Sequence, residues 1–550
     1  MKVIHALFLA VLCSVALCSC ECKSMKEVNI VPKPVSLEIQ QGCFKLTPKT
    51  VINVVAGADD LTPANEFMSK LVAASFGSPL KIEEGAAKNK AINVTVTPEM
   101  KAETYTLNVT SKGIDIKAGS SKGVFYAYQS LRQMMPTGIE KGEKMKSIEI
   151  QNVNIQDEPR FAYRGMMLDV CRHFFPVDSV KTYIDMLALH KLDRFHWHLT
   201  DDQGWRIEIK KYPKLTEIGS TRPGTVIGRN SGKYDSIPVS GFYTQEEIKD
   251  VVKYAADRYI TIIPEIELPG HARAALASYP ELGCTGGPYE VAREWGVFPE
   301  VYCAGNDKTF EFWEGVFDEV IPLFPSEYIH VGGDECPKAA WKKCKKCQAR
   351  IKKEKLKNEY ELQSYVIHRM ENYLNSKGKK LIGWDEILEG GLSKTATVMS
   401  WRGTKGGIAA AKAGNHVVMT PNSHVYLDYY QSKDTKNEPF GIGGFVDVAK
   451  VYSLEPTAGL NPEEAQMVIG AQANLWAEYI KTFSHVQYMV LPRMAALAEV
   501  AWTPAAQKDY EDFKKRAIGL TDRYEALGYN YAKHILNKPA TTTEEVKKEQ

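Results

Sequence analysis

Residues 259–268 read YITIIPEIEL, a nearly continuous run of apolar and β-branched residues that follows a helical pattern over 245–258. Runs of the same kind recur at 164–170, 194–199, 328–333, 380–387, 396–401, 416–419 and 467–473. Further helical patterns lie between most of them, at 179–190, 310–323, 359–376 and 484–502. Buried strands that alternate with helices indicate an α/β fold with a parallel sheet, and eight of them predict a TIM-type (β/α)8 barrel.

A smaller unit precedes these strands. Short β-rich segments at 51–55, 92–97, 105–110 and 113–119 surround a region that also contains an amphipathic helical pattern over 123–135. This pattern predicts a small N-terminal α/β domain over 21–157, in which no residue has a catalytic signature. We expect the barrel to occupy 158–530 and a charged tail to follow over 531–550.

The N-terminus has the pattern of an export signal. The sequence MKVIHALFLAVLCSVALCSC has one lysine, then an apolar run from Val3 to Leu17, then small residues and cysteines. It predicts a signal peptide over 1–20, because the run is too short for a membrane-spanning helix. Residues 17–20 are similar to a bacterial lipobox in which Cys20 would be lipidated; cleavage and release is the alternative. We expect an exported protein of the cell envelope or a secreted one, in contact with a membrane only through such an anchor.

The composition argues against a nucleic-acid partner. The chain has 550 residues, with 69 Lys and Arg against 67 Asp and Glu, which gives a net charge of +2. Such a balance offers no basic surface for nucleic acid. The oligomeric state stays open.

The cysteines permit more than one arrangement. Cys284 and Cys303 flank a loop rich in Gly and Pro and could form a disulfide in an oxidising compartment. Cys344 and Cys347 have CxxC spacing, but no second half-site with the spacing of a zinc ribbon follows in the sequence. A bridge or two free thiols is therefore the expectation for that pair.

Polar and aromatic residues follow the predicted strands. In a barrel, functional side chains lie at the C-terminal ends of the strands. Those positions hold Arg172, Asp201, Asp202, His271, Asp334, Glu335, Trp384, Asp385, Glu386, Trp401, Tyr426, Asp428, Trp476 and Glu478. Because charged side chains are seldom buried without a function, we expect these residues to converge on one functional site.

The residue types at this mouth suit a sugar, whose C–H face packs on aromatic rings while its hydroxyls bind charged groups. Glycoside cleavage needs a proton donor and a group that stabilises an oxocarbenium-like centre. Asp334-Glu335 is favoured, because Gly332-Gly333 lets the chain leave the strand so that both side chains reach the site. Their closeness predicts that one is ionised while the other holds a proton. Asp385-Glu386 is the alternative pair.

Four longer stretches resemble the family 20 glycoside hydrolases, the β-N-acetylhexosaminidases: RGMMLDVCRHFF (164–175), HWHLTDDQGWR (196–206), PEIELPGH (264–271) and HVGGDE (330–335). Segments around the tryptophans and Tyr426 match as well, so the resemblance covers about residues 30–530. It implies an exo-acting, retaining enzyme that removes terminal β-linked N-acetylglucosamine, and also N-acetylgalactosamine. It further implies substrate-assisted catalysis through an oxazolinium intermediate, without metal or organic cofactor.

The resemblance also implies the catalytic roles. Glu335 would be the general acid and then the general base. Asp334 and Tyr426 would hold the 2-acetamido group, whose carbonyl oxygen attacks C1. Asp201 and His271 would form a supporting dyad that tunes Glu335.

The remaining residues would bind the sugar. Three tryptophans would form the wall of the pocket, and three charged residues would bind the outer ring hydroxyls. This substrate-binding set consists of Trp384, Trp401, Trp476, Arg172, Asp428 and Glu478.

Three other hypotheses remain open. His196 and His198 share a strand face and, with Asp201 and His271, could form the zinc site of a metal-dependent hydrolase. A glycan-binding lipoprotein without activity would use the same aromatic platform. A two-carboxylate glycosidase would take its nucleophile from Asp385-Glu386.

Overall fold

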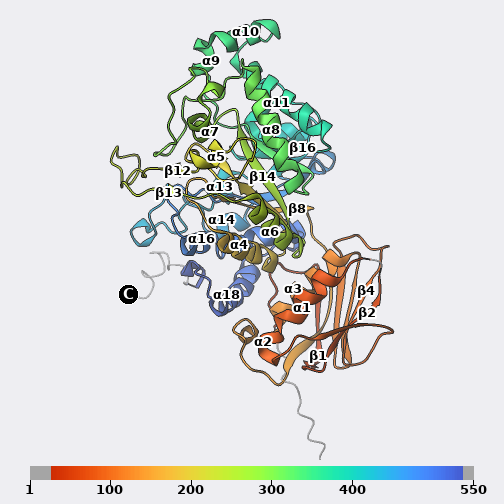
Figure 1. Ribbon diagram of the computed structural model, residues 1–550. Coiled ribbons are helices and arrows are strands. Elements are labelled where there is room, and N and C mark those ends of the chain that lie inside the picture. The colour runs from red at the N-terminus through yellow and green to blue at the C-terminus, as the bar shows by residue number, and fades with distance from the viewer. Residues whose placement is uncertain (1–26, 58, 537–550) are drawn as a thin grey trace, which may run out of the picture.

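The computed structural model describes residues 27–57 and 59–536, which form an N-terminal sheet domain and an eight-stranded barrel (Figure 1). The expected fold class is therefore confirmed. The signal peptide predicted over 1–20 and the lipid anchor predicted at Cys20 lie outside the described residues, so both stay predictions. Among the helices described, none is long and apolar enough to cross a membrane.

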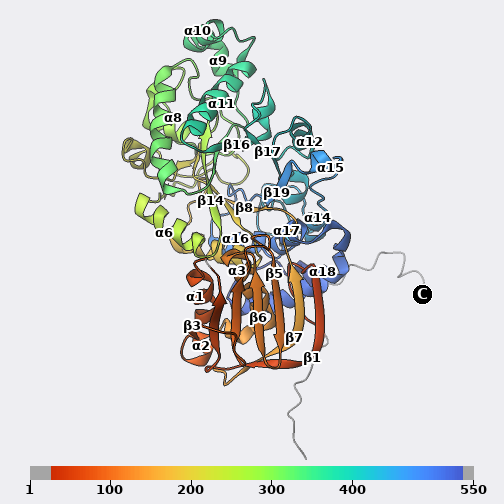
Figure 2. The same ribbon diagram turned by 90° about the vertical axis from the view of Figure 1, so that its right-hand side faces the viewer.

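The N-terminal domain is a seven-stranded mixed sheet in the order β1-β7-β5-β6-β4-β2-β3, with its strands side by side in Figure 2. Its strands are β1 (Ser36–Leu46), β2 (Val51–Ala56), β3 (Lys81–Glu84), β4 (Ile92–Val96), β5 (Tyr105–Thr110), β6 (Gly113–Ala118) and β7 (Ile148–Asp157). Three helices accompany it: α1 (Thr62–Leu71), α2 (Ala73–Phe76) and α3 (Ser121–Met134). The predicted stripe of α3, with Phe125, Tyr128 and Leu131, is buried.

The barrel is closed, with parallel neighbours in the order β14-β15-β16-β17-β18-β19-β8-β9. Each of the eight predicted runs contributes one strand. These strands are β8 (Tyr163–Asp169), β9 (Arg194–His198), β14 (Thr261–Leu268), β15 (Tyr328–Gly332), β16 (Lys380–Trp384), β17 (Thr397–Ser400), β18 (Val417–Met419) and β19 (Val468–Ala473). The predicted barrel is confirmed.

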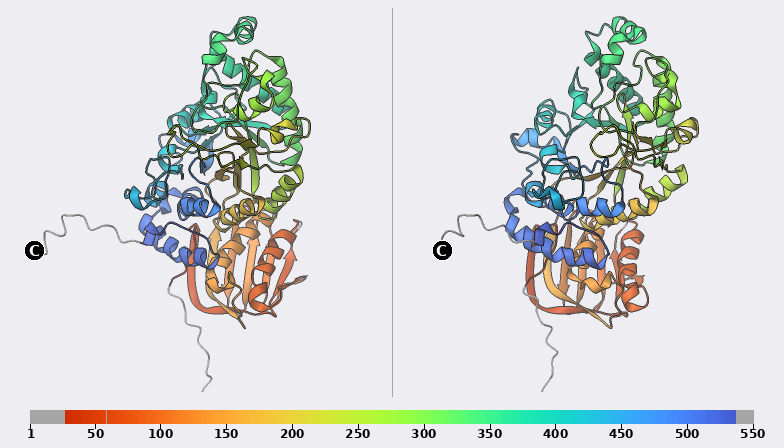
Figure 3. Two further views of the ribbon diagram at one scale, coloured as in Figure 1. Left: turned by 60° about the vertical axis from the view of Figure 1, so that its left-hand side comes forward. Right: turned by 90° about the vertical axis from the view of Figure 1, so that its left-hand side faces the viewer.

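Helices surround the strands on the outside (Figure 3). The longer ones are α4 (Val177–Leu189), α6 (Gln245–Ala256), α8 (Asp307–Val320), α11 (Glu359–Ser376), α12 (Lys405–Lys412), α16 (Phe483–Val490), α17 (Arg493–Trp502) and α18 (Tyr510–Ala526). Shorter elements lie mostly in the loops: β10 (Thr200–Asp201), β11 (Gly204–Trp205), α5 (Lys214–Glu217), β12 (Thr221–Arg222), β13 (Val239–Ser240), α7 (Arg273–Ser278), α9 (Ala339–Lys343), α10 (Lys345–Lys353), α13 (Asn422–Val425), α14 (Val448–Tyr452) and α15 (Pro462–Ala465).

Helix α6 shows how the local sequence specifies an element. Thr244 and Glu247 form a reciprocal capping box, in which each side chain accepts a hydrogen bond from the other residue's backbone N–H. This arrangement satisfies two of the N–H groups that a helix start leaves unpaired. Ile248, Val251 and Ala255 recur at helical spacing and are buried, so one face of α6 packs against the barrel.

The interior of the barrel changes from apolar to charged along the strands. Alternate residues of a strand point to the same side, so Ile263, Glu265 and Glu267 share one face of β14. This face points into the barrel. Ile263 belongs to an apolar cluster with Tyr163, Tyr328, Ile382, Trp384, Met399 and Val418. Glu265 and Glu267 follow toward the C-terminal end. The packed layer therefore supports a charged layer directly beneath the mouth.

A buried polar network joins the two domains. The Asp157 carboxylate, at the end of β7, accepts hydrogen bonds from Lys191 Nζ at 3.1 Å, Tyr105 OH at 2.6 Å and Trp502 Nε1 at 2.9 Å. Helix α18 lies beside the N-terminal domain (Figures 1 and 3), and its Arg516 donates to the carbonyl of Ile30 at 2.8 Å. These contacts hold the barrel and the sheet domain together.

The C-terminal boundary differs from the prediction. The expected tail begins at Tyr531, whereas the structure packs the chain up to Leu536, in a 3-10 helix over Lys533–Leu536. Tyr531, Ala532 and Ile535 are buried, and the Tyr531 ring lies 5.8 Å from that of Tyr524 in α18. These apolar contacts hold residues 531–536 on the barrel domain. The rest of the predicted tail, 537–550, lies outside the described residues.

Candidate active site

All eleven residues predicted for the site line one cavity of about 380 Å3 at the C-terminal mouth of the barrel. They come from the ends of seven strands and from the segment after β18. The set comprises Arg172, Asp201, His271, Asp334, Glu335, Trp384, Trp401, Tyr426, Asp428, Trp476 and Glu478. The strand-end rule thus located residues that are far apart in the sequence.

The backbone leaves β15 as the two glycines predict. Gly332 and Gly333 have φ values of 65° and 91°, and Glu335 itself has a φ of 42°. A Cβ atom on Gly332 would lie 1.7 Å from Glu267 Oε2, so only glycine fits there. The turn directs both Asp334 and Glu335 into the cavity.

The adjacent carboxyls differ in proton affinity. Burial raises the pKa of Asp334 to about 7. The His271 ring N–H, with Nε2 3.6 Å from Glu335 Oε2, lowers the pKa of Glu335 below its ordinary value. The two shifts have opposite directions, as the predicted split requires: Asp334 has the higher proton affinity of the pair and Glu335 the lower.

His271 has a different nearest partner from the one expected. Its Nδ1 lies 2.9 Å from Asp202 Oδ2 and 3.4 Å from Asp201 Oδ1. Although burial alone lowers it, the carboxylates of Asp201 and Asp202 hold the pKa of His271 well above its usual range. The structure therefore adds Asp202 to the expected dyad of Asp201 and His271. Asp201 also binds Arg172 Nη2 at 2.9 Å.

Arg172 is fixed in place at the mouth. Its Nη1 lies 3.1 Å from Asp169 Oδ2, and its Nε donates to Gln203 Oε1 at 2.9 Å. The guanidinium carbon lies 5.0 Å from the centre of the Trp476 ring. These contacts hold the planar guanidinium in a fixed orientation at the cavity. Little conformational entropy is therefore lost when a ligand binds to it.

Aromatic rings form the wall of the cavity. Trp401 and Tyr426 are stacked at 6.1 Å with an interplanar angle of 21°. Trp476 lies 5.8 Å from Trp384 and 6.4 Å from Tyr426. Trp384 Nε1 donates to Glu265 at 2.9 Å, which fixes the orientation of the deepest ring. Burial raises the pKa of Tyr426 well above its usual value, so its hydroxyl keeps its proton.

The alternative carboxylate pair lies behind the residues that line the cavity. Asp385 accepts from Arg402 Nε at 2.7 Å, and Glu386 accepts from Trp401 Nε1 at 2.9 Å. Neither residue lines the cavity. Their contacts position Arg402 and Trp401, so the geometry gives them no place as a nucleophile.

The histidines of the rival zinc site do not share one centre. His196 Nε2 lies 3.0 Å from Glu265 Oε2, and His198 also binds Glu265. His198 Nε2 lies 3.0 Å from Asp201, while the nearest carboxylate of His271 is Asp202. Although burial opposes it, Glu265 and Asp201 raise the pKa of His198 to about 10. Glu265, His198 and Asp201 form a chain of alternating charges beneath the cavity. This chain holds the Asp201 carboxylate in place.

Sequence reasoning gave no role to several lining residues. Glu267 is buried in β14, and burial raises its pKa well above the usual value, with help from the Asp334 and Glu265 charges. The sequence does contain a signal for this residue, because Glu265 and Glu267 occupy alternating positions of an otherwise apolar strand. Asn230, Trp295, Tyr429, Ile442 and Tyr479 complete the rim from long loops, where no periodicity marks them.

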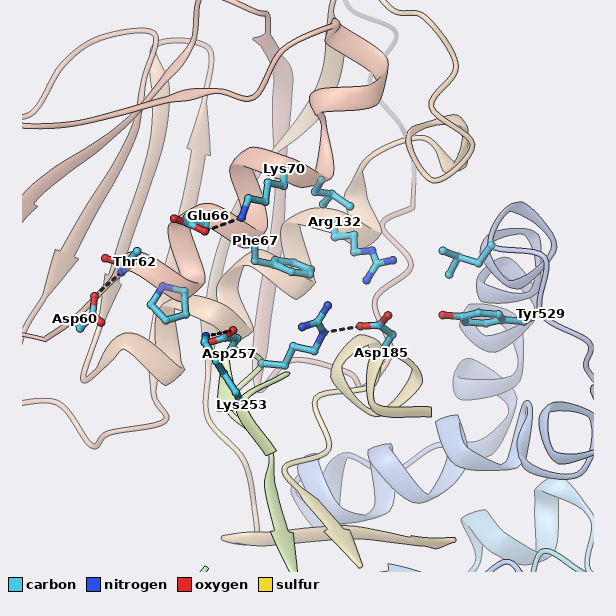
Figure 4. A pocket seen from close by; sticks show the side chains of 14 residues that line it. Asp60, Thr62, Glu66, Phe67, Lys70, Arg132, Asp185, Lys253, Asp257 and Tyr529 are labelled. Atoms are coloured by element: carbon cyan, nitrogen blue, oxygen red, sulfur yellow. Dashed lines mark hydrogen bonds and ion pairs between the residues drawn. The ribbon is translucent and has the colours of Figure 1, made fainter. Parts of the chain in front are cut away.

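A second cavity, of about 640 Å3, lies between the two domains and has a different character (Figure 4). Its charged groups are already paired with one another, as in Lys70–Glu66 at 2.7 Å and Lys253–Asp257 at 2.6 Å. Arg258 likewise binds Asp185. Among the described residues that line this cavity, no convergent set of unpaired groups is present, so the mouth of the barrel is the candidate active site.

Comparison with known proteins agrees with this assignment. The model of the catalytic domain of glycosyl hydrolase family 20 matches residues 161–505, and that of domain 2 of the same family matches 27–158. A β-hexosaminidase of Porphyromonas gingivalis is 46% identical over 525 residues, which cover 94% of this chain. The chain spans 66% of the length of that relative.

Solved structures are similar over most of the chain. A family 20 β-N-acetylhexosaminidase of Streptomyces coelicolor is 30% identical, with a TM-score of 0.79 over 91% of this chain and 97% of its own. A family 20 exo-β-N-acetylglucosaminidase of Vibrio harveyi, solved with N-acetylglucosamine, is 33% identical, with a TM-score of 0.81 over 92% of this chain and 79% of its own.

Proposed function

The chain belongs to glycosyl hydrolase family 20, and from this membership and the cavity we propose that it is an exo-acting, retaining β-N-acetylhexosaminidase. Its substrate is a terminal, non-reducing β-linked N-acetylglucosamine, and N-acetylgalactosamine as well. The observation that carries the proposal is a pair of buried carboxylate oxygens, Asp334 Oδ1 and Asp428 Oδ1, without a hydrogen-bond partner among residues 27–57 and 59–536.

An unpaired buried acceptor is costly unless a ligand supplies the donor. Asp334 is placed to accept the acetamido N–H and Asp428 to accept an outer ring hydroxyl. Burial raises the pKa of Asp428 well above the usual value, and the charges of Glu478 and Arg172, which line the same cavity, also act on it. The Vibrio harveyi relative, solved with N-acetylglucosamine, supports this sugar as the occupant.

The reaction proceeds by two displacements at C1. The carbonyl oxygen of the substrate's own acetamido group attacks C1, the glycosidic C–O bond breaks, and Glu335 gives its proton to the departing oxygen. Asp334 stabilises the positive charge of the resulting oxazolinium ring, while Tyr426 OH donates to the carbonyl oxygen. Glu335 then takes a proton from the water that attacks C1 and reopens the ring, so the β-configuration is retained.

Substrate binding moves the proton within the carboxyl pair. In the free site Asp334 has the stronger hold on it, because burial raises its pKa to about 7, whereas His271 lowers the pKa of Glu335. The acetamido N–H favours ionised Asp334, and the sugar displaces water from Glu335, which favours its protonated form. The single proton therefore passes to Glu335, where the departing oxygen needs it. His271, which faces both carboxyls, stays positively charged.

We expect kcat/KM to fall above about pH 7 with the slope of one proton, because the pair then loses the proton that serves as the acid. In Asp334→Asn, Glu335 alone must hold this proton. Its pKa is lowered by His271, so the alkaline limb moves to lower pH. Initial rates across pH for both proteins test this. A limb that stays in place in the variant would contradict proton sharing.

The small volume and the charged lining of the cavity favour exo-action. Arg172, Asp428 and Glu478 line one side, and a volume of about 380 Å3 is at the small end for ligand sites. Incubation with a reduced chitooligosaccharide should therefore release only monosaccharide at early times, as followed by chromatography. Early appearance of internal fragments, together with a fall in the viscosity of a long polymer, would refute exo-action.

A further inference from the structure

Four cysteine thiols meet at one point outside the active site. Cys303 Sγ lies 3.7 Å from both Cys344 Sγ and Cys347 Sγ, and Cys284 Sγ lies 3.8 Å from Cys347 Sγ. All four sulfurs lie within 4.8 Å of one another. Cys303 and Cys347 are fully buried, Cys344 is nearly so, and Cys284 is partly exposed. We propose that this four-cysteine cluster binds a structural zinc ion.

The separations are those of a tetrahedral metal site. Zinc–thiolate bonds are about 2.3 Å long, so ligands at the corners of a tetrahedron lie about 3.8 Å apart. A disulfide would bring two sulfurs to about 2.05 Å. The measured separations of 3.7 and 3.8 Å correspond to the edges of the tetrahedron. The Cys284–Cys303 disulfide that the sequence left open is absent among the described residues, since both cysteines are free thiols.

The second half-site is assembled by the fold and not by local spacing. Gly283 and Tyr302 pair in an antiparallel bridge, and Cys303 N donates to Leu282 O at 2.8 Å. This pairing sets Cys284 and Cys303 side by side opposite the CxxC of 344–347. The sequence provides no second CxxC. Cys344 and Cys347 are free thiols, one of the two expected alternatives, and only the fold brings Cys284 and Cys303 beside them.

The surroundings suit four thiolates around a divalent cation. Such a centre has a net charge of −2, and Lys345 and Lys346, between the two cysteines of the CxxC, are exposed beside it. Cys344 is also the N-cap of α10, whose N-terminal N–H groups favour thiolate. Four soft sulfur ligands in a tetrahedron select zinc over the harder divalent ions. With all four positions filled by protein, the site is structural.

The ion would fasten an outlying segment to the barrel. Helices α9 and α10 lie at the end of the molecule farthest from the N-terminal domain (Figures 1 and 2). Trp341 Nε1 donates to Tyr302 O at 2.8 Å, and a Cβ on Gly305 would meet Lys346 C at 2.1 Å, so the two segments approach closely. This outlying segment starts just after Glu335. The zinc therefore ties the loop that follows the proposed acid to the loop that follows β14.

The test is metal analysis of the full chain purified without chelators. We expect one zinc per chain by plasma mass spectrometry. In denaturant, four thiols should react with a thiol reagent only after a chelator is added. Exchange into cobalt should give the charge-transfer and d–d absorption of a tetrahedral thiolate site. None of these measurements depends on enzymatic activity.

The variant Cys303→Ser should lose the bound zinc and become sensitive to trypsin within 336–357. Lys345→Ser, which lies between the two cysteines of the CxxC but is not a ligand, should keep both zinc and resistance. If the variant fails to fold, the metal and cobalt measurements on the unmodified chain still decide. Zinc-free protein with four unreactive, oxidised thiols would establish two disulfides. Zinc-free protein with four free thiols, or iron in place of zinc, would equally overturn the proposal.

Discussion

Replacing Glu335 by Gln is expected to lower kcat/KM on a β-linked disaccharide of N-acetylglucosamine by about 10²–10⁴-fold, the usual contribution of a positioned general acid. The amide keeps the shape of the side chain but cannot donate a proton to the departing oxygen. A nitrophenyl glycoside has a weakly basic leaving group and needs less help. For that substrate kcat/KM should fall much less, while kcat falls because the second step has lost its base.

Two controls separate this role from a structural one. Azide attacks C1 without a general base, so it should restore kcat of Glu335→Gln on the nitrophenyl glycoside and give a β-azide product. The thermal unfolding midpoint should stay close to that of the unmodified protein, because Glu335 is partly exposed. An equal loss of kcat/KM on both substrates, with no effect of azide, would remove Glu335 from the acid and base role.

The barrel and the site residues were predictable because each depends on a local signal. A strand buried on both faces must be apolar along most of its length, so the apolar run over 259–268 can be recognised as such a strand from the sequence. Once the strands are known, closure of the sheet brings their C-terminal ends together, which is why Arg172 and Glu478 meet although they are far apart in the sequence. The role of the glycines before Asp334 followed from backbone freedom, and their φ values confirm it.

The contacts that depend on loop conformation were not predictable. Asp201 and Asp202 are neighbours in the sequence, and only the path of the chain after β10 decides that Asp202 lies nearer to His271. Trp295 and Asn230 reach the rim from loops without periodic patterns and hydrogen-bond to one another. The four-cysteine cluster likewise depends on a bridge between residues distant in the sequence.

Removing the acetamido group from the substrate is also expected to lower kcat/KM strongly. If the acetamido oxygen is the nucleophile, a β-glucoside that lacks this group has lost it, and Asp385 and Glu386 do not line the cavity to replace it. A well-oriented internal nucleophile corresponds to an effective molarity of about 10⁵–10⁸ M. We therefore expect kcat/KM for the glucoside to be lower by a factor on the order of 10⁵ or more. Asp334 would then also lose its hydrogen-bonding partner on the ligand.

Participation of the acetamido group is tested most directly by the release of nitrophenol from the β-N-acetylglucosaminide and from the β-glucoside by the same enzyme preparation. We expect rapid turnover of the first and none detectable of the second. Equal turnover would contradict participation of the acetamido group and revive a two-carboxylate mechanism. Turnover of neither, by folded protein that still binds N-acetylglucosamine, would contradict the proposed activity and leave a sugar-binding protein.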